Sequence, residues 1–310
     1  MFTTWVRSHV RHALMRVGRV TRSPGIGIAA AVVATAACGS SEAPAPGLAT
    51  PSLVLSHQHA PAGSPIALTY KFVVSPNARF DQDYRVMVHV LDADESLMWT
   101  DDHQPEPPTS KWQPGQTIEY TRTVFVPISP YIGDAGIHLG LYSTTDQKRV
   151  PLVGQDMGQL AYHVGTINLQ PQTENLFTVF KDGWHRAEVA AQNEAVEWQW
   201  TKKEATLAFK HPKKDAVLYL DLDSPGRALH GPQTVRVSMG GAVLEEFTVP
   251  PDVQMLRKVA LPVSRMGAEA MSELQISVDT TFVPSLVEGS ASKDKRELGV
   301  RVFHAFVDAR

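Results

Sequence analysis

Apolar residues recur at every second position in short runs along this chain, and this spacing constrains its fold more than any other feature. Between residues 84 and 92, for example, Val86, Val88 and Val90 alternate with polar or larger side chains. A period of two places alternate residues on one buried face of a β-strand. No long stretch has the 3.6-residue period of an amphipathic helix, so the sequence predicts an all-β protein.

The runs form two blocks, and Pro, Gly and Asp separate the runs within each block. In the first block we expect strands at 52–57, 66–74, 84–91, 97–100, 117–126, 135–143 and 159–165. This number of short strands with turns between them predicts an immunoglobulin-like β-sandwich over residues 52–170.

The second block, residues 171–310, is expected to form a second sandwich. Its candidate strands are 176–180, 184–189, 195–201, 204–210, 216–222, 233–239, 242–249, 256–261, 273–279 and 298–307. Gly240-Gly241 between two runs is typical of a hairpin turn. We expect one helical turn, around Arg265 to Ser272, and a jelly-roll-like arrangement of the strands.

The N-terminus has the pattern of an export signal. The first 38 residues hold five arginines and no acidic residue, and residues 26–37 are small and apolar. This apolar run is shorter than the roughly 20 residues that span a membrane, so we expect a signal peptide at 1–37. Thr35-Ala36-Ala37-Cys38 resembles a bacterial lipobox, which implies cleavage before Cys38 and attachment of lipid to its thiol. Ordinary cleavage near Ala36 or Ala37 is the alternative.

Cys38 is the only cysteine of the chain, so a disulfide scaffold is excluded. Residues 38–51 are rich in Pro, Ala and Ser and are expected to form a flexible tether after the lipid. Gly39 is not the Asp that retains some lipoproteins at the inner membrane, so we expect a lipid anchor at the outer membrane. Residues 39–310 carry 24 basic and 32 acidic side chains, which argues against a nucleic-acid partner.

The densest group of ligand-type side chains is an acidic cluster in the first block. It comprises Asp92, Asp94, Asp101 and Asp102. Carboxylates at this spacing could bind Ca²⁺ if a hairpin brought them together. The alternative, which we favour, is a polar turn between two strands. His57 and His59 could chelate a metal from one strand face, but we favour the interpretation that they are exposed loop histidines.

No motif of a known catalytic class is present: the chain lacks HExxH, GxSxG and a phosphate-binding glycine loop. A glycan hydrolase would need two facing carboxylates, for which Glu188, Glu194 and Glu197 are the candidates near the tryptophans. Spacing alone does not show that any two of them face one another. We therefore expect a protein that is not an enzyme and that needs no cofactor.

Aromatic residues in the second block indicate a sugar-binding platform. Trp184, Trp198 and Trp200 lie close in sequence, and alternation places the last two on one strand face. An indole can stack on the apolar face of a pyranose, while polar neighbours bind its hydroxyls. The polar candidates are Glu197, Tyr219 and Arg227. The alternative, which we favour for Trp198 and Trp200, is that the tryptophans fill the core between two sheets.

Several short motifs of the second block recur together in one known group of proteins. They are Gly183-Trp184-His185 with Glu188, Glu197-Trp198-Gln199-Trp200-Thr201, Ala205-Thr206-Leu207, Phe282-Val283-Pro284, Asp294-Lys295-Arg296 and Leu298-Gly299-Val300-Arg301-Val302. Residues 174–310 thereby resemble a jelly-roll module found beside bacterial glycosyltransferases and other envelope-polysaccharide proteins. Gln199 stands where that pattern often has Arg.

The first block looks like a sandwich of the same protein group. The residues concerned are Asp102-His103, Pro108-Thr109, Trp112-Gln113-Pro114-Gly115 and Val126-Pro127. The resemblance supplies no catalytic residue for either block. Asp294 and Arg296 are expected to pair across a turn, and Gly299 to permit a close backbone approach, so this end motif is interpreted as structural.

Together these features predict an exported, non-catalytic lipoprotein of the bacterial envelope. It would bind or organise an envelope glycan or a protein partner. Two alternatives stay open: a structural subunit of an envelope export or assembly complex, and a glycan hydrolase.

Overall fold

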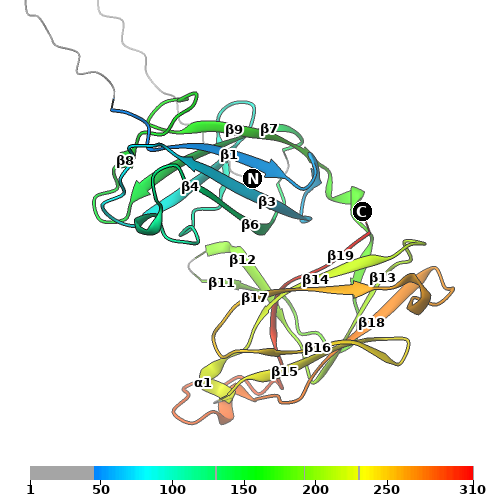
Figure 1. The fold of residues 1–310 in the computed structure, drawn as a ribbon. Coiled ribbons are helices and arrows are strands. Elements are labelled where there is room, and N and C mark those ends of the chain that lie inside the picture. Colours follow the sequence, from blue (N-terminus) through cyan, green and yellow to red (C-terminus); the bar gives the residue numbers. More distant parts are fainter. Residues whose placement is uncertain (1–44, 130, 192, 230, 310) are drawn as a thin grey trace, which may run out of the picture. The chain divides into compact units, whose positions relative to one another are not determined.

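The fold was analysed in a computed structural model, which describes residues 45–309 apart from Pro130, Gln192 and His230. The expected signal peptide and the lipidation site Cys38 lie outside the described residues. Strands dominate the described chain, as the alternating pattern predicts, and they form two β-sandwiches (Figure 1). The described residues include no helix with the length and hydropathy that crossing a bilayer requires.

The first sandwich is built from strands β1 to β9. Their bounds are β1 (Ala49–Leu55), β2 (His59–Pro61), β3 (Pro65–Val74), β4 (Tyr84–Leu91), β5 (Leu97–Thr100), β6 (Thr117–Phe125), β7 (Gly133–Ser143), β8 (Arg149–Val150) and β9 (Tyr162–Gln170). One sheet has the order β1-β3-β6, and the other has the order β2-β9-β7-β4-β5 with β8 on β7. All pairs are antiparallel except β2–β9. This is the predicted immunoglobulin-like sandwich.

The second sandwich is built from β10 to β19. Their bounds are β10 (Thr178–Phe180), β11 (Glu188–Ala190), β12 (Asn193–Trp200), β13 (Glu204–Lys210), β14 (Ala216–Asp223), β15 (Gln233–Met239), β16 (Ala242–Val249), β17 (Met255–Leu261), β18 (Met271–Val278) and β19 (Arg301–Asp308). Its sheets have the orders β10-β13-β18-β15-β16 and β11-β12-β19-β14-β17. Two five-stranded antiparallel sheets form the predicted jelly-roll-like sandwich.

Each sandwich has its own apolar core, formed by alternate residues of both of its sheets. The first core includes Tyr70 and Phe72, and the second includes Phe209, Leu218 and Leu220; all five are fully buried. Burying a side chain of this size contributes roughly 1.5–3 kcal/mol, so these residues hold the paired sheets together.

Turns and short helices complete the two sandwiches. Gly240 and Gly241 both have positive φ and join β15 to β16, so the predicted hairpin is confirmed. The helical elements are α1 (Gly226–Leu229) and the 3₁₀ turns Thr109–Lys111, Gln172–Glu174, Val263–Arg265 and Pro284–Leu286.

Three local expectations were wrong. Of the strand expected at 184–189, only Glu188 and Val189 lie in a strand, at the start of β11. The helical turn around Arg265 to Ser272 is absent: a 3₁₀ turn ends at Arg265, and β18 already begins at Met271. The tether was expected to reach residue 51, but β1 starts at Ala49, whose small side chain is fully buried in the first core. Pairing of Ala49 with Val74 explains the earlier start, because backbone hydrogen bonding does not need large side chains.

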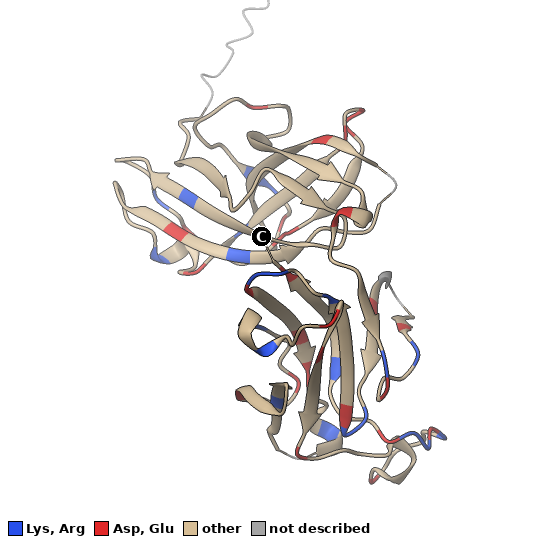
Figure 2. Ribbon diagram, turned by 90° about the vertical axis from the view of Figure 1, so that its right-hand side faces the viewer, with Lys and Arg blue, Asp and Glu red and all other residues tan. Residues whose placement is uncertain are grey.

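Charged residues of both signs are distributed over both sandwiches. Figure 2 shows Lys and Arg interspersed with Asp and Glu along the strands and turns. Some of them form ion pairs: Arg236 binds Glu246 across the paired strands β15 and β16, and Arg257 of β17 binds Glu245 of β16, an edge strand of the other sheet.

Candidate binding face on the second sandwich

Trp198 and Trp200 lie on the outer face of the sheet β11-β12-β19-β14-β17. Trp200 pairs with Arg301 of β19, and Gln199 pairs with Val302. Val302 is part of the apolar core, so its neighbour Arg301 points outward. Trp200, the partner of Arg301, points to the same side, and so does Trp198, two positions along β12. Both tryptophans are half-buried. They therefore share one face, as the alternation predicts. This face is not the core, so the favoured core interpretation is wrong for these two residues.

Arg301 lies among the aromatic rings of this face. Its guanidinium carbon is 5.2 Å from the ring centroid of Trp198, 5.8 Å from that of Trp200 and 5.0 Å from that of Phe303. A guanidinium at such distances is attracted by the negative faces of the rings. The cation and the rings thus form one rigid group, which we call the Trp–Arg cluster (Trp198, Trp200, Arg301 and Phe303).

Asp223 fixes the orientation of this arginine. Nε of Arg301 donates to Asp223 Oδ1 at 2.9 Å, and Nη2 donates to Oδ2. Asp223 is only 7% exposed, and it lies opposite Arg301 in the pairing of β14 with β19. A bidentate pair with a buried carboxylate fixes the plane of the guanidinium, and its remaining N–H groups are not directed at Asp223.

Two further aromatic rings support the tryptophans edge-on. Phe303 packs on Trp198 with centroids 6.3 Å apart, and Phe282 packs on Trp200 at 5.7 Å. Interplanar angles of 63° and 76° are typical of edge-to-face packing. The indoles are therefore held in fixed orientations on the sheet.

Tyr219 shares the face but lies at a distance from the cluster. Its neighbours Leu218 and Leu220 are in the core, so Tyr219 points outward from β14, with the Lys258 amine 5.3 Å from its ring centroid. It is four residues from Asp223, which is roughly 13 Å along a strand.

The remaining sugar-site candidates lie elsewhere. Trp184 packs against the second core, and its indole N–H donates to the Thr206 carbonyl at 2.9 Å, so it has the structural role of the alternative interpretation. Glu197 is exposed and alternates with Trp198, which places it on the opposite face of β12. Arg227 is exposed in α1, between β14 and β15, away from the sheet face.

The carboxylates considered for hydrolysis do not form a facing pair. Glu188 pairs with Trp198 across β11 and β12, while Glu197 pairs with Val189. Neighbouring positions of a strand point to opposite faces, so Glu188 and Glu197 do not flank a common point. The Glu188 carboxylate instead lies 2.7 Å from the Arg296 guanidinium. The side chain of Glu194 lies outside the described residues.

The end motif of the resemblance forms the expected ion pair. Asp294 accepts from Nε and Nη2 of Arg296 at 3.0 and 2.7 Å. These hydrogen bonds from Arg296 lower the pKa of Asp294. Because Arg296 also binds Glu188, it ties the segment before β19 to β11.

Gly299 permits the close backbone approach that the sequence predicts. A Cβ at this residue would lie 2.4 Å from Thr201 Oγ1 and 2.7 Å from the Lys202 carbonyl oxygen. The Gly299 N–H donates to the Thr201 carbonyl at 2.6 Å. This residue therefore brings the C-terminal strand next to the end of β12 and positions the cluster.

Three of the four aspartates of the candidate Ca²⁺ site bind separate partners through their carboxylates. Asp92 Oδ1 accepts from the backbone N–H groups of Asp94 and Ser96, and Asp102 Oδ1 accepts from that of Val88. Asp101 binds Arg122. Within the described chain, no group of three or more His, Cys, Asp or Glu is arranged to hold a metal ion. Asp92 has the hydrogen bonds of a turn residue, as the alternative interpretation proposed.

Asp101 is the centre of a polar network between the two sheets of the first sandwich. It accepts from Tyr70 Oη at 2.9 Å and from Nε and Nη2 of Arg122 at 3.0 and 2.8 Å. His103 donates from Nδ1 to the Asp101 carbonyl and accepts at Nε2 from Tyr120 Oη at 2.8 Å. Burial raises the pKa of both tyrosines and lowers that of His103. The network joins β3 and β6 to the segment after β5.

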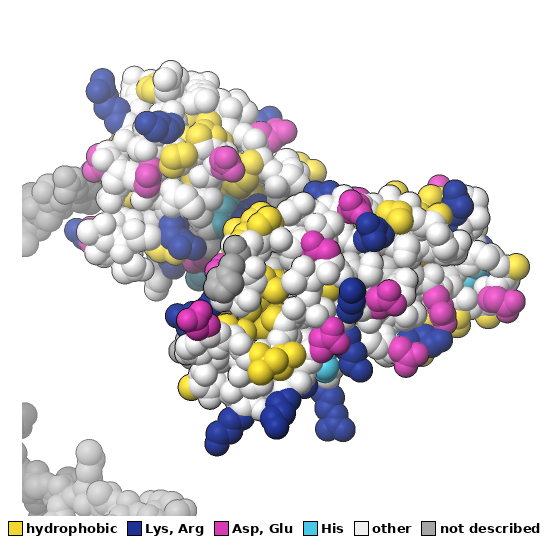
Figure 3. Space-filling view, turned by 90° about the horizontal axis from the view of Figure 1, so that it is seen from below, with side chains coloured by type: hydrophobic (Ala, Val, Ile, Leu, Met, Phe, Trp, Pro, Cys, Tyr) yellow, Lys and Arg dark blue, Asp and Glu magenta, His cyan; other side chains and the backbone are white. Residues whose placement is uncertain are grey.

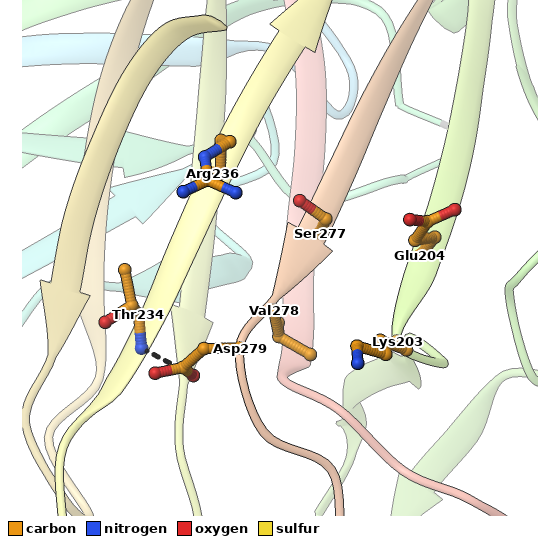
Figure 4. A pocket seen from close by; sticks show the side chains of 7 residues that line it. All are labelled: Lys203, Glu204, Thr234, Arg236, Ser277, Val278 and Asp279. Carbon is orange, nitrogen blue, oxygen red and sulfur yellow. Dashed lines mark hydrogen bonds between the residues drawn. The ribbon is translucent and has the colours of Figure 1, made fainter.

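The other sheet of the second sandwich has a polar outer face with a pocket (Figure 4). The pocket is lined by Lys203, Glu204, Thr234, Arg236, Ser277, Val278 and Asp279. Glu204, Ser277 and Arg236 form one row across β13, β18 and β15. No lining residue is aromatic, and the Arg236 guanidinium is paired with Glu246, so this pocket lacks a stacking surface.

Hydrophobic side chains also reach the surface in small groups. Figure 3 shows such groups on one face of the molecule, with side chains of both charge signs between them. Isolated apolar residues at a protein surface are common, so these groups alone do not indicate a binding site.

Arg301, Asp223, Phe303 and Phe282 were missed by the sequence analysis. The signal for two of them was present, because Val300 and Val302 form the inward face of the last strand. Arg301 and Phe303 therefore had to point outward. Asp223 and Phe282 come from distant segments, and only the tertiary fold brings them to the cluster.

No protein-family model matches the chain, and no characterised protein matches its sequence. Among solved structures, the N-terminal CBM22-1-CBM22-2 tandem domain from Paenibacillus barcinonensis Xyn10C matches with 10% identity and a TM-score of 0.24, over 80% of each chain. A Bacteroides uniformis beta-glucuronidase matches with 12% identity and a TM-score of 0.29, over 84% of this chain and 30% of its own. The Enterococcus faecalis MSCRAMM ACE matches with 9% identity and a TM-score of 0.25, over 84% of this chain and 96% of its own. TM-scores this low carry no conclusion about the function of this chain.

Proposed function

We propose that this chain is a non-catalytic, exported lipoprotein that binds a glycan of the bacterial envelope through the Trp–Arg cluster. The observation that carries the proposal is the arrangement of Trp198 and Trp200 on an outer sheet face, with Arg301 fixed between them. The export and lipid anchor are supported by the basic N-terminus, the short apolar run and Cys38.

The cluster has the chemistry that sugar recognition requires. Half-buried indoles present flat apolar surfaces on which the C–H face of a pyranose can stack. Asp223 binds two N–H groups of Arg301, and the guanidinium has further donors for hydroxyl or carboxylate oxygens. Because the rings and the guanidinium are already held in place, a ligand would pay little for ordering them.

The proposal is tested by titrating the purified full chain with envelope polysaccharide while recording tryptophan fluorescence. Reaction products are analysed in the same samples. A saturable change in fluorescence without new reducing ends is the expected result. Release of products would favour the hydrolase, and no response to any envelope glycan would contradict the glycan proposal.

A protein partner at a sheet edge is the second candidate. The three-stranded sheet of the first sandwich ends in β1 on one side and β6 on the other, so both carry unpaired backbone groups. A strand from another protein could add to such an edge, as an assembly subunit requires. Proline substitutions in β1 and β6 that leave the sandwich folded would abolish this binding and leave glycan binding unchanged.

A further inference from the structure

Three histidines form a row on the outer face of the first sandwich, and none of them is among the metal-site candidates considered above. His89 of β4 pairs with His138 of β7, and His138 pairs with His163 of β9. Ile137 and Leu139, the neighbours of His138, are in the core, so the imidazole of His138 points away from it.

The imidazoles of His138 and His163 approach each other at the distance of two ligands on one ion. Their ring centroids are 5.6 Å apart, with an interplanar angle of 83°. With metal–nitrogen bonds of about 2.0–2.1 Å, two imidazoles on one tetrahedral ion have centroids about 5 Å apart. The observed separation of the two rings is close to this value.

Gly136 leaves a space beside these two rings. A Cβ at Gly136 would lie 3.7 Å from His138 Nε2 and 3.8 Å from His163 Nδ1. One ring nitrogen of each histidine therefore borders the same point. Glycine is unfavourable inside a strand and often marks a site where a ligand approaches closely.

A turn that carries a carboxylate lies beside the two histidines. Glu95 is in the turn that joins β4 to β5 directly after Leu91, and Leu91 pairs with Gly136. A negative charge near this point favours the binding of a cation.

The histidines of the HxH motif lack this arrangement. His59 Nδ1 is hydrogen-bonded to Asn168 Oδ1 at 3.2 Å, and His57 Nδ1 to Ser56 Oγ at 3.0 Å. Among the described glycines, none has a Cβ position that borders both of their rings. His59 therefore serves as a control on the same sheet.

We propose that His138 and His163 bind a divalent transition-metal ion above Gly136. Water completes the coordination, because two protein ligands leave positions open. Imidazole nitrogens favour Cu²⁺ over Zn²⁺ and disfavour Ca²⁺ and Mg²⁺. The site is separate from the Trp–Arg cluster and does not depend on glycan binding.

The test is calorimetric titration of the full chain, purified without a histidine tag, with ZnCl₂ and with CuCl₂. We expect one metal ion to bind per chain, with a dissociation constant in the micromolar range. Cu²⁺ should bind more tightly than Zn²⁺, and CaCl₂ should not compete. His138→Ala and His163→Ala should each lower the affinity for this ion at least about tenfold. Gly136→Val keeps both ligands but fills the space, and valine suits a strand, so it should weaken binding equally.

His59→Ala is the matched control and should bind metal like the wild type. Near-UV circular dichroism of each variant shows whether the first sandwich is folded. Wild-type affinity in both His138→Ala and His163→Ala would overturn the proposal, as would the absence of binding to the wild type. Loss of binding in His59→Ala alone would also overturn it, because the HxH motif would then be the site.

Discussion

The two sandwiches use the same alternating pattern but place their charged pairs differently. In the first sandwich, Asp101 and Arg122 lie with Tyr70 between the two sheets and join them. In the second sandwich, Asp223 and Arg301 lie on the outer sheet face and hold a cation among aromatic rings. The comparison teaches that an ion pair between sheets stabilises the fold, whereas a similar pair on the outer face can position a binding group.

The largest effect is expected when the pair of the first sandwich is broken. Asp101→Ala removes the acceptor of Arg122 and of the buried Tyr70 hydroxyl. Arg122 is 40% exposed, which reduces the penalty for its unpaired charge, so we expect a loss of about 2–4 kcal/mol in unfolding free energy. Urea denaturation with separate probes for each sandwich measures it. For the control Asp92→Ala, in a turn, we expect a loss of about 1 kcal/mol or less. A loss of the same size for Asp101→Ala would contradict the stabilising role of Asp101.

Gly299→Ala tests the segment that positions the cluster in the second sandwich. The added Cβ would overlap Thr201 Oγ1 and the Lys202 carbonyl, so the backbone must shift. We expect the second sandwich to lose about 1–3 kcal/mol, while the first stays unchanged. Gly165→Ala, in the first sandwich, is the control, because its Cβ would meet nothing within 4 Å and its φ, like that of Gly299, is not positive. Equal effects of the two variants would exclude overlap as the cause.

Asp223→Ala breaks the corresponding ion pair of the second sandwich. It leaves Arg301, which is 33% exposed, without its carboxylate partner, and we expect a cost of about 1–2 kcal/mol in stability. Glycan affinity should fall as well, because the guanidinium loses its fixed plane. Asp101→Ala, measured under conditions where the protein stays folded, should leave glycan affinity unchanged. A variant Asp223→Ala that binds normally would refute the positioning role.

The smallest effect is a difference in acid sensitivity. Burial lowers the pKa of His89, His103 and His138 in the folded first sandwich below the ordinary value of 6.5. The unfolded chain therefore binds more protons below pH 6.5, and stability falls as the pH drops toward the folded pKa values. In the second sandwich, Asp294 has a lowered pKa, so its contribution is lost only below the ordinary value of 3.8.

Denaturation midpoints of the two sandwiches at pH 7, 6 and 5 measure this difference. We expect the midpoint of the first sandwich to fall across this range, and His103→Gln to reduce the fall. A fall of the same size in the second sandwich would contradict the assignment to these histidines.

Much of the fold was predictable because it depends on alternation, which is a local property. The run Tyr84–Leu91 was predicted with its observed bounds, and so were Leu97–Thr100 and Ala242–Val249. The turn Gly240-Gly241 was predictable because positive φ values favour glycine. The start of β1 was not, since Ala49 and Thr50 have no marked strand pattern, and pairing with β3 orders them.

The candidate site was predictable only in part. Alternation placed Trp198 and Trp200 together, but it could not show which face of β12 is buried, because the partner strand β19 begins 101 residues after Trp200 in the chain. The same limit applies to Trp184, whose closeness in sequence suggested a shared platform. The fold turns it toward the core, where the Thr206 carbonyl accepts from its indole.

The central claim is tested most directly by comparing tryptophan variants for glycan binding. Calorimetry would measure wild type, Trp198→Ala, Trp200→Ala and Trp99→Phe against one envelope polysaccharide. Trp99 is a half-buried tryptophan of the first sandwich, and its indole N–H has no hydrogen-bond partner among the described residues, so its replacement by Phe is a mild control. The account predicts that each alanine variant loses at least about tenfold in affinity while Trp99→Phe binds normally. Wild-type affinity in both alanine variants would contradict it.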